Sequence, residues 1–216
     1  MTQTIRAKDL LKIIENMAYA IEKNVDYLTR LDSEIGDGDH GINLNRSFKE
    51  IRQKLGGLKD GDFGMILKMV GSTLISSTGG AVGPLYGTAF MRGGEVVEGK
   101  REIDLNDLVE IFDAAERGIQ SIGGAKVGEK TMLDTFHPAV ETLKEAKSKN
   151  FDLIEAFKQC VGAAEKGMQS TKQMVAKKGR SMFLGERARG HQDVGATSCY
   201  LMLKSALDSL ETLRQK

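Results

Sequence analysis

The sequence predicts an all-α protein that folds as a single domain over residues 1–216, with about eight antiparallel amphipathic helices. Apolar side chains recur at steps of three and four residues along most of the chain, which is the period of one helical face. Only two prolines occur, and no segment alternates strictly between apolar and polar residues as a half-buried strand would. We therefore expect each helix to bury one face in a shared core.

The first half of the chain carries three apolar stripes and one shorter helical segment. The stripes predict helices over residues 10–28, 44–55 and 66–74, and the short helix is expected around residues 86–92. The stripe residues are Leu10, Leu11, Ile14, Met17, Ala18, Ile21, Val25, Leu28, Leu44, Phe48, Ile51, Leu55, Ile66, Met69, Val70 and Leu74.

The second half carries four stripes, which predict helices over residues 105–119, 132–143, 151–168 and 196–213. Asp104 is the expected N-cap of the first of these helices, and Pro138 is expected to kink the second. The stripe residues are Leu105, Leu108, Phe112, Ala115, Ile119, Met132, Leu133, Phe136, Val140, Leu143, Phe151, Ile154, Phe157, Val161, Ala164, Met168, Ala196, Tyr200, Leu203, Leu207, Leu210 and Leu213.

Charge and cysteine content exclude several classes of protein. Lys and Arg total 31 and Asp and Glu total 30, so no general field attracts nucleic acid or an anionic membrane. Cys160 and Cys199 lack metal-type spacing, and Cys199 is expected to be a small buried residue. The N-terminal segment lacks the apolar core of a signal peptide, and no stretch is long enough to span a membrane. A reducing, cytoplasmic setting is expected.

Four connectors have unusual composition. Residues 35–41, 78–87 and 122–128 are rich in glycine, and residues 179–195 form a long segment of mixed charge. Long loops in a compact domain are more often functional than idle. If the helices alternate in direction, all four connectors emerge at the same end, so we expect them to meet at one rim.

The strongest local pattern places Asp32, Asp37 and Asp39 among three glycines. Converging carboxylates repel one another, and oxygen-only ligands suit a hard cation such as magnesium or calcium. The spacing does not fit a calcium EF-hand. A solvated acidic turn is the alternative, since Asp and Gly are common turn residues.

The residues that follow strengthen the cation interpretation. His40, Gly41, Ile42 and Asn43 lead directly into a helical stripe, and a helix N-terminus offers free N–H groups and a positive dipole end to phosphate. Magnesium is usually bound by few carboxylates together with substrate phosphates. A nucleotide site is therefore expected here.

The remaining patterns each have two readings. The glycine run over residues 76–84 is not a Walker P-loop. Its small residues would either let backbone amides approach an oxyanion or phosphate, or allow two helices to pack closely. Met132 is either a core residue or a thioether against a base, and Asp134 is a surface group or supports the site from behind. Arg180 could place a cation on phosphates, and Asp193 is either a helix cap or part of the ligand site. His137 and His191 are expected to be structural, and His191 has no identifiable partner.

Four strings together resemble the small nucleotide-binding L subunits of bacterial dihydroxyacetone kinases. The strings are LDSEIGDGDHGINLNRSF, SSTGGAVGPLYGTAF, GEKTMLDTFHPA and KGRSMFLGERARGHQDVGATS, and they extend from residue 31 to residue 198. The resemblance implies an eight-helix antiparallel barrel with the nucleotide site at one rim. The family often has proline where Val194 stands.

The resemblance also implies roles for individual residues. Asp32, Asp37 and Asp39 would hold two magnesium ions, and with Arg180 they would form the catalytic group. The nucleotide, ADP or ATP, would be bound by His40, Gly41, Ile42, Asn43, Ala81, Val82, Gly123, Met132, Arg180, Asp193, Val194 and Gly195.

For function, the resemblance implies transfer of the γ-phosphoryl group of ATP to dihydroxyacetone held covalently on a separate K subunit. ADP would remain bound as a coenzyme and be recharged by a phosphotransferase-system protein of the M type. Three alternatives stay open: use of free ATP or another small ketose, a nucleotide-sensing regulator that binds a transcription factor, and a helical scaffold without ligands.

Overall fold

The computed structural model describes residues 4–58 and 61–214. These residues form nine α-helices, two 3-10 helices and two strands of two residues each. The elements are β1 (Ile5–Arg6), α1 (Ala7–Lys23), α2 (Val25–Ile35), α3 (His40–Gly57), α4 (Phe63–Ser77), α5 (Val82–Glu95), β2 (Glu102–Ile103), α6 (Leu105–Gly123), α7 (Leu133–Ser148), α8 (Leu153–Ser170), η1 (Thr171–Gln173), η2 (Arg180–Ala188) and α9 (Val194–Arg214). The all-helical prediction is confirmed, apart from the small sheet.

The helix predicted over residues 10–28 is in fact two helices, because the backbone departs from helical geometry at Asn24 (φ −110°, ψ 13°). The Asn24 side chain donates to the carbonyl of Ala20 at 2.8 Å. Asparagine that bonds to nearby backbone competes with the helical pattern. The described residues therefore form nine α-helices where about eight were expected, because the first predicted helix is divided in two.

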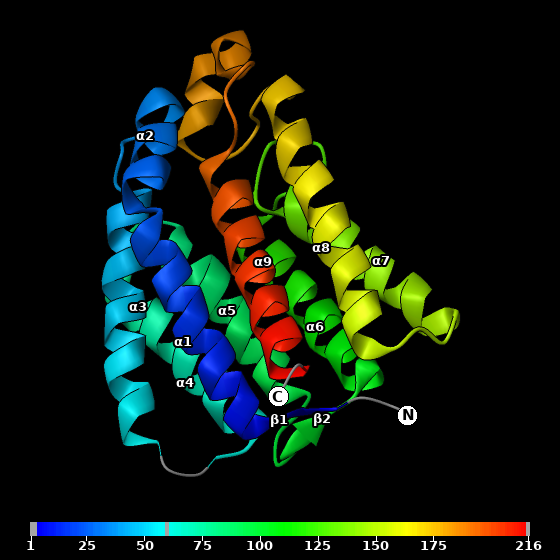
Figure 1. The fold of residues 1–216 in the computed structure, drawn as a ribbon. Coiled ribbons are helices and arrows are strands. Elements are labelled where there is room, and N and C mark those ends of the chain that lie inside the picture. Colours follow the sequence, from blue (N-terminus) through cyan, green and yellow to red (C-terminus); the bar gives the residue numbers. More distant parts are fainter. Residues whose placement is uncertain (1–3, 59–60, 215–216) are drawn as a thin grey trace.

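The sequence pattern predicted no strand, but β1 and β2 pair antiparallel, with Ile5 opposite Ile103. Two-residue strands are too short to show alternation. The pairing ties the start of α1 to the segment before α6, and the Ala7 N–H continues it by donating to the Arg101 carbonyl at 2.8 Å. Both strands lie at the lower end of the molecule in Figure 1, near the two chain ends.

Neighbouring helices in the chain pack on one another from α3 through α9, and α9 then packs against α1. The helix α1 also contacts α3, while α2 extends beyond α1 and packs against α3 and α9 (Figure 1). All nine helices contribute to one buried core. Within it, the Phe112 ring stacks on Phe136 at a centroid distance of 5.2 Å and meets Phe157 edge-on at 6.0 Å. The core encloses an apolar cavity of about 160 Å³.

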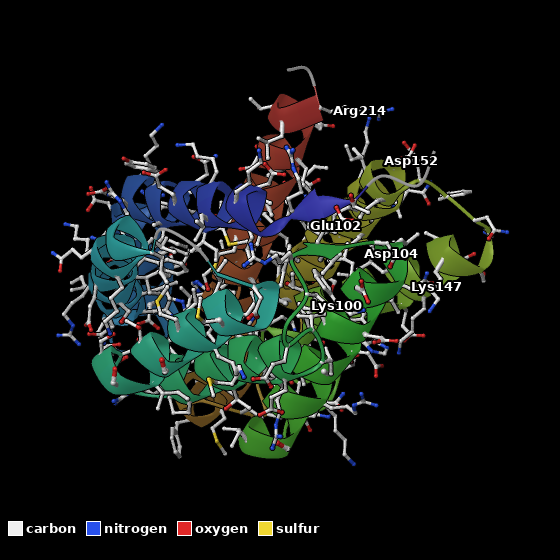
Figure 2. The ribbon with its side chains drawn as sticks, turned by 90° about the horizontal axis from the view of Figure 1, so that it is seen from below. Lys100, Glu102, Asp104, Lys147, Asp152 and Arg214 are labelled. Atoms are coloured by element: carbon white, nitrogen blue, oxygen red, sulfur yellow. The ribbon has the colours of Figure 1, made fainter. Side chains whose placement is uncertain are left out.

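Several local predictions are confirmed. Asp104 caps α6 by accepting from the Asp107 N–H at 3.0 Å, and Cys160 and Cys199 are buried free thiols. Asp104 lies with Lys100, Glu102 and Asp152 at the end of the molecule that Figure 2 views from below. None of the described helices is long and apolar enough to cross a membrane.

The opposite end carries four connectors: residues 36–39, 78–81, 124–132 and 171–193. They join helix ends at the upper side of Figure 1. The predicted long loops are shorter than expected or partly helical, since α5 already begins at Val82 and η2 occupies residues 180–188. Proline is tolerated in the first turn of a helix, which explains why Pro84 does not delay α5.

Candidate metal and nucleotide site

The aspartate loop is shaped by hydrogen bonds from its own backbone. Asp32 lies in the last turn of α2, and its Oδ2 accepts from the N–H groups of Asp39 at 2.9 Å and His40 at 3.1 Å. A Cβ at Gly36 would lie 2.1 Å from Asp32 Oδ1, and Gly38 has a φ of +75°. Glycine is thus required at both positions, by space at the first and by backbone conformation at the second.

Three carboxylates converge in this loop. Ligand oxygens of Asp32, Asp37 and Asp39 lie within 4.8 Å of one another, with Asp32 buried and the other two exposed. The Arg180 guanidinium pairs with Asp37 at 2.8 Å, so one positive charge faces three negative charges. The remaining negative charge and the all-oxygen donor set fit a hard divalent cation such as magnesium.

The first turn of α3 begins directly after these carboxylates. Gly41 is closely packed, because a Cβ there would lie 2.6 Å from the Val25 carbonyl and 2.8 Å from Thr29 Oγ1. The early N–H groups of a helix have no acceptor within it, so this turn can offer donors to an anion. The side chain of Ile42 is 55% exposed, which leaves the surface over this turn open.

His40 points into the protein rather than toward the loop surface. Its Nε2 lies 2.9 Å from Ser198 Oγ, which in turn lies 2.7 Å from the Tyr86 hydroxyl. Tyr86 donates to the Gly195 carbonyl at 3.1 Å. Burial lowers the pKa of His40 to about 4, although the nearby Asp39 and Asp37 charges oppose this shift. A neutral His40 therefore links α3 to α5 and α9 beneath the site.

The glycine run after α4 divides into two parts. A Cβ at Gly83 or Gly87 would lie within 2.8 Å of a backbone carbonyl, so these two glycines serve helix packing. Gly79 and Gly80 are exposed in the loop. A Cβ at Gly79 would lie 3.8 Å from the amide nitrogen of Asn43, which is an ordinary contact distance. Only the loop part is available to a ligand.

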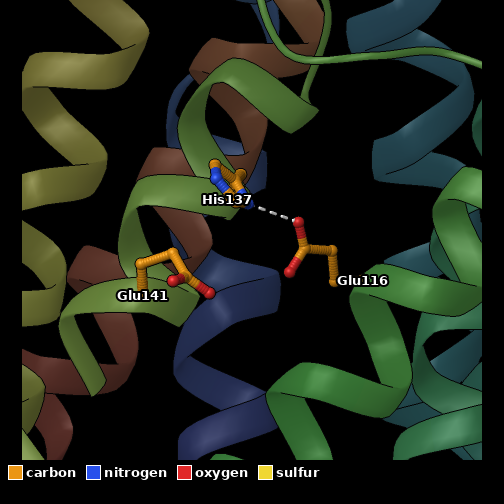
Figure 3. A group of neighbouring side chains, drawn as sticks. All are labelled: Glu116, His137 and Glu141. Atoms are coloured by element: carbon orange, nitrogen blue, oxygen red, sulfur yellow. Dashed lines mark hydrogen bonds and ion pairs between the residues drawn. The ribbon is translucent and has the colours of Figure 1, made fainter. Parts of the chain in front are cut away.

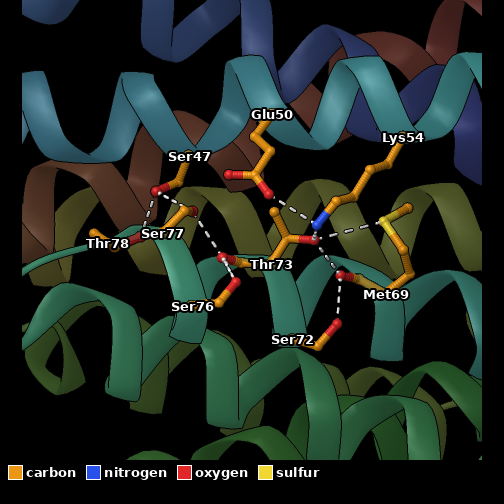
Figure 4. A network of polar contacts seen from close by, with 9 residues as sticks. All are labelled: Ser47, Glu50, Lys54, Met69, Ser72, Thr73, Ser76, Ser77 and Thr78. Carbon is orange, nitrogen blue, oxygen red and sulfur yellow. Dashed lines mark hydrogen bonds and ion pairs between the residues drawn. The ribbon is translucent and has the colours of Figure 1, made fainter.

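Buried hydroxyl groups hold this loop against α3 (Figure 4). Ser47 Oγ forms hydrogen bonds with Thr78 Oγ1 and with Ser77 Oγ, and Arg46 donates to the Ser77 carbonyl at 3.2 Å. Arg46 also donates to Asn43 Oδ1 at 3.2 Å. The connector from α4 to α5 is thereby placed beside the first turn of α3.

The connector before α7 is organised by Asp134, which was expected either at the surface or behind the site and is 2% exposed. Its carboxylate accepts from the N–H groups of Gly128 and Thr131, the latter at 2.7 Å. The surface reading of Asp134 is therefore wrong, because two backbone donors in the turn draw it inward. Met132 is 5% exposed and lines the apolar cavity, as the core reading predicts.

Lys130 is a central residue that the sequence patterns did not single out. It is 1% exposed, and its Nζ donates to the carbonyls of Thr171 at 2.7 Å, Met174 at 3.3 Å and His191 at 2.5 Å. These acceptors flank the segment that carries Arg180. One buried ammonium thus joins both ends of that segment to the connector before α7.

Asp193 and His191 complete the rim. Asp193 Oδ2 accepts from the Ala196 N–H at 2.7 Å, so Asp193 caps α9, as one of its two readings proposed. Burial raises the pKa of Asp193 to about 6, while the Ala196 hydrogen bond and Lys130 oppose this rise. His191 does have a partner, contrary to expectation, since its Nδ1 lies 3.0 Å from Glu34 Oε2 on α2. Such pairing across distant segments is invisible to sequence spacing.

The structure brings most of the predicted site residues to this rim. Arg180 contacts Asp37, a Cβ at Gly195 would lie 3.7 Å from Met132, and a Cβ at Gly124 would lie 3.8 Å from Lys178 Nζ. These contacts bring three of the four connectors together, and the bonds of Ser47 to Ser77 and Thr78 place the fourth, over residues 78–81, beside α3 at the same end, as expected. Gly123 lies at the end of α6, Ala81 and Val82 lie at the start of α5, and Val194 begins α9.

This all-helical chain, with its loop of three carboxylates at one end, matches a known family of proteins. Residues 34–208 match the family described as the DAK2 domain, and the chain belongs to this family. It is 45% identical over 179 residues to "PEP-dependent dihydroxyacetone kinase, ADP-binding subunit DhaL" of Escherichia coli, covering 83% of this chain and 85% of that protein. Subunit DhaL of "PEP-dependent dihydroxyacetone kinase 2" from Listeria innocua is 43% identical, covering 92% and 93%.

Solved structures show the same fold. The crystal structure of the dihydroxyacetone kinase of C. freundii matches with a TM-score of 0.74 and 24% identity, covering 97% of this chain and 36% of that one. The same enzyme in complex with AMP-PNP and Mg²⁺ matches with a TM-score of 0.70 and 23% identity. This chain therefore spans about a third of those solved chains, and the likeness supports the fold.

Proposed function

We propose that this chain is the ADP-binding subunit of a phosphotransferase-type dihydroxyacetone kinase. The observation that carries the proposal is the convergence of three aspartates within 4.8 Å beside the first turn of α3. Relatives that bear this subunit name are 43–45% identical over most of both chains. The balance of charges in the loop leaves room for cations, and the helix start supplies donors for phosphate.

In this proposal Asp32, Asp37 and Asp39 hold two magnesium ions. The hydrogen bonds from Asp39 and His40 fix Asp32 through Oδ2, which leaves Oδ1 for a ligand. When bound, the ions would offset the negative charge of the phosphates and the charge that develops during transfer.

The phosphates would lie over His40–Asn43, with the backbone of Ala81 and Val82, at the start of α5, on the other side. Arg180 is 73% exposed at its side chain, so it can turn from Asp37 to the phosphates at little cost. Gly123 and Met132 would border the base and ribose, and the turn formed by Asp193, Val194 and Gly195 would close the site. This placement assigns each predicted residue to a part of the nucleotide.

The reaction would pass the γ-phosphoryl group of bound ATP to dihydroxyacetone, giving dihydroxyacetone phosphate. Phosphoryl transfer needs chiefly positioning and charge stabilisation, which this rim is suited to supply. The acceptor would be held covalently on a separate K subunit, and an M-type phosphotransferase protein would recharge the retained ADP. We also propose that the protein acts in the cytoplasm. Its helices would form an eight-helix barrel, in which α1 and α2 together count as one helix of the barrel.

The test is the variant Asp37→Asn, assayed for phosphoryl transfer with a K subunit, an M subunit and dihydroxyacetone. We expect transfer to be abolished while far-ultraviolet circular dichroism shows unchanged helix content, because Asp37 is exposed in a loop. Asp26→Asn on the exposed face of α2 is the matched control and should retain activity.

Mass spectrometry of the purified protein under native and denaturing conditions adds a second readout. Stoichiometric ADP that survives dialysis supports the coenzyme role, whereas bound ADP without transfer would favour a nucleotide-sensing regulator. Full transfer by Asp37→Asn would refute the aspartate site. Assay with other small ketoses decides whether dihydroxyacetone is the acceptor.

A further inference from the structure

A second group of potential metal ligands lies on the sides of two helices, apart from the rim connectors. Glu116 lies on α6, while His137 and Glu141 lie on α7 (Figure 3). One ligand atom from each of the three side chains lies within 4.8 Å of the others. We call this group the helix cluster.

Secondary structure and packing place these three side chains together. His137 and Glu141 are four residues apart, so they share one face of α7. The helices α6 and α7 pack against each other, and the His137 Nδ1 lies 2.7 Å from Glu116 Oε1. Because all three residues lie inside regular helices, their backbone positions are fixed more firmly than those of a loop.

Glu116 is the unusual member of the helix cluster, because it is only 6% exposed. Its Oε1 accepts from His137 and, at 3.3 Å, from the Gln120 amide. Glutamine carries no charge, and imidazole binds metals in its neutral form. A desolvated carboxylate is stabilised most by a cation, and no lysine or arginine among the described residues pairs with Glu116.

Glu141 is free to serve as a ligand. It pairs with Lys144 at 3.0 Å, but its side chain is 54% exposed, and exposed pairs of this kind contribute little free energy. Lys144 also pairs with Asp113 at 2.8 Å, so it keeps a carboxylate partner if Glu141 turns away. No strong interaction has to be broken for Glu141 to join His137 and Glu116.

We propose that Glu116, His137 and Glu141 bind a divalent transition-metal ion, at a site separate from the aspartate loop. In a tetrahedral site, metal–ligand bonds of about 2.0–2.2 Å place ligand atoms roughly 3.3–3.6 Å apart, so the side chains of the helix cluster must close by about 1 Å around the ion. One imidazole and two carboxylates suit Zn²⁺ or Co²⁺ better than Mg²⁺, which prefers oxygen ligands only. Water would complete the coordination on the exposed side of Glu141.

The ion would join α6 to α7, the two helices that flank the connector over residues 124–132. That connector contains Lys130, which holds the segment carrying Arg180. The bound ion would therefore stiffen the rim from the side without contacting the nucleotide.

The experiment measures Zn²⁺ binding by equilibrium dialysis, and Co²⁺ binding by its visible absorption. It uses the full chain in excess Mg²⁺ and ADP, and is repeated in Asp37→Asn so that the aspartate loop is disabled independently. We expect one Zn²⁺ per chain in both proteins, with the absorption of tetrahedral cobalt. Affinity should fall about 10- to 100-fold in Glu116→Gln and His137→Gln.

Glu141→Gln is the variant least able to disturb folding, because its side chain is exposed, and it should also weaken Zn²⁺ binding. Glu145→Gln is the matched control on the same helix: its exposed carboxylate pairs with Lys149 outside the helix cluster, and Zn²⁺ affinity should not change. Thermal unfolding without metal checks that each variant is folded. The proposal would be overturned if the wild-type chain failed to bind Zn²⁺, or if Glu141→Gln and His137→Gln bound Zn²⁺ with wild-type affinity, whatever the outcome of the kinase assay.

Discussion

The aspartate loop is held in place by backbone geometry, whereas the helix cluster is held by side chains projecting from two packed helices. Asp32 depends on N–H donors from Asp39 and His40 and on the missing side chain of Gly36. Glu116 and His137 depend only on the packing of α6 against α7. Substitutions that restrict the backbone of the loop, or that remove the hydrogen bonds supporting it, should therefore disrupt the aspartate loop and leave the helix cluster intact.

The largest expected effect comes from Lys130→Met. This change leaves buried carbonyls of Thr171, Met174 and His191 without their donor, which should cost about 3 kcal/mol or more of unfolding free energy. The Arg180 segment loses its anchor, so nucleotide-dependent transfer should fall on the order of 100-fold. Urea unfolding and ADP release kinetics provide the measurements.

Lys130→Arg is the control, since a guanidinium can still donate to several carbonyls and should recover part of both losses. Zn²⁺ binding at the helix cluster should change far less than ADP binding. Equal losses at both places would show that the two regions are not independent.

The next effect in size is expected for Gly36→Ala. A Cβ at this position would lie 2.1 Å from Asp32 Oδ1, so the carboxylate must move away from its partners. Magnesium-dependent ADP affinity, measured by calorimetry, should fall about tenfold or more. Gly57→Ala has open space around the added methyl group and should bind ADP as the unchanged chain does.

The pH dependence of stability should show two opposing contributions near the rim. His40 has a pKa of about 4 when folded and about 6.5 when unfolded, so its contribution is present above pH 6.5 and is lost as pH falls toward 4. Asp193 has a pKa of about 6 when folded and about 3.8 when unfolded, so its contribution is present below pH 3.8 and is lost as pH rises through 6.

Replacing each group isolates its contribution. His40→Gln should remove the loss of stability in acid, worth roughly 3 kcal/mol, and Asp193→Asn should remove the opposite slope. Urea unfolding of the nucleotide-free chain between pH 4 and 7 measures both. Parallel curves for the unchanged chain and both variants would contradict these assignments.

The smallest effect is expected for Glu141→Gln in the absence of metal. Its exposed pair with Lys144 should contribute no more than about 0.5 kcal/mol, while Glu116→Gln should cost more because Glu116 is buried. Thermal unfolding of the two variants without metal gives the comparison. A larger loss for Glu141→Gln would show that the helix cluster is stabilised differently from this account.

Sequence spacing predicted the features that depend on neighbours in the chain. The helical stripes, the Asp104 cap and the clustering of the aspartates all follow from local pattern. The pattern did not reveal the break at Asn24, since the apolar period continues across it and only the side-chain bond to Ala20 shows the interruption.

Features that depend on distant segments were missed. Lys130 reads as an ordinary charged residue in the string GEKTM, yet its three acceptors lie 41 to 61 positions away. The pairing of His191 with Glu34 likewise joins residues that are far apart in the sequence. Local periodicity predicts that connectors share one end of the helices, but it does not indicate which side chains pair there.

The hydrogen bonds beneath the aspartate loop affect the order in which the site can form during protein synthesis. His40 and Tyr86 form hydrogen bonds with Ser198 and with the Gly195 carbonyl, and both of these belong to α9, which is translated well after the aspartate loop. A chain still attached to the ribosome therefore exposes the three aspartates before their support exists. The proposed nucleotide site is therefore complete only after α9 has been synthesised and has docked between α1 and α8.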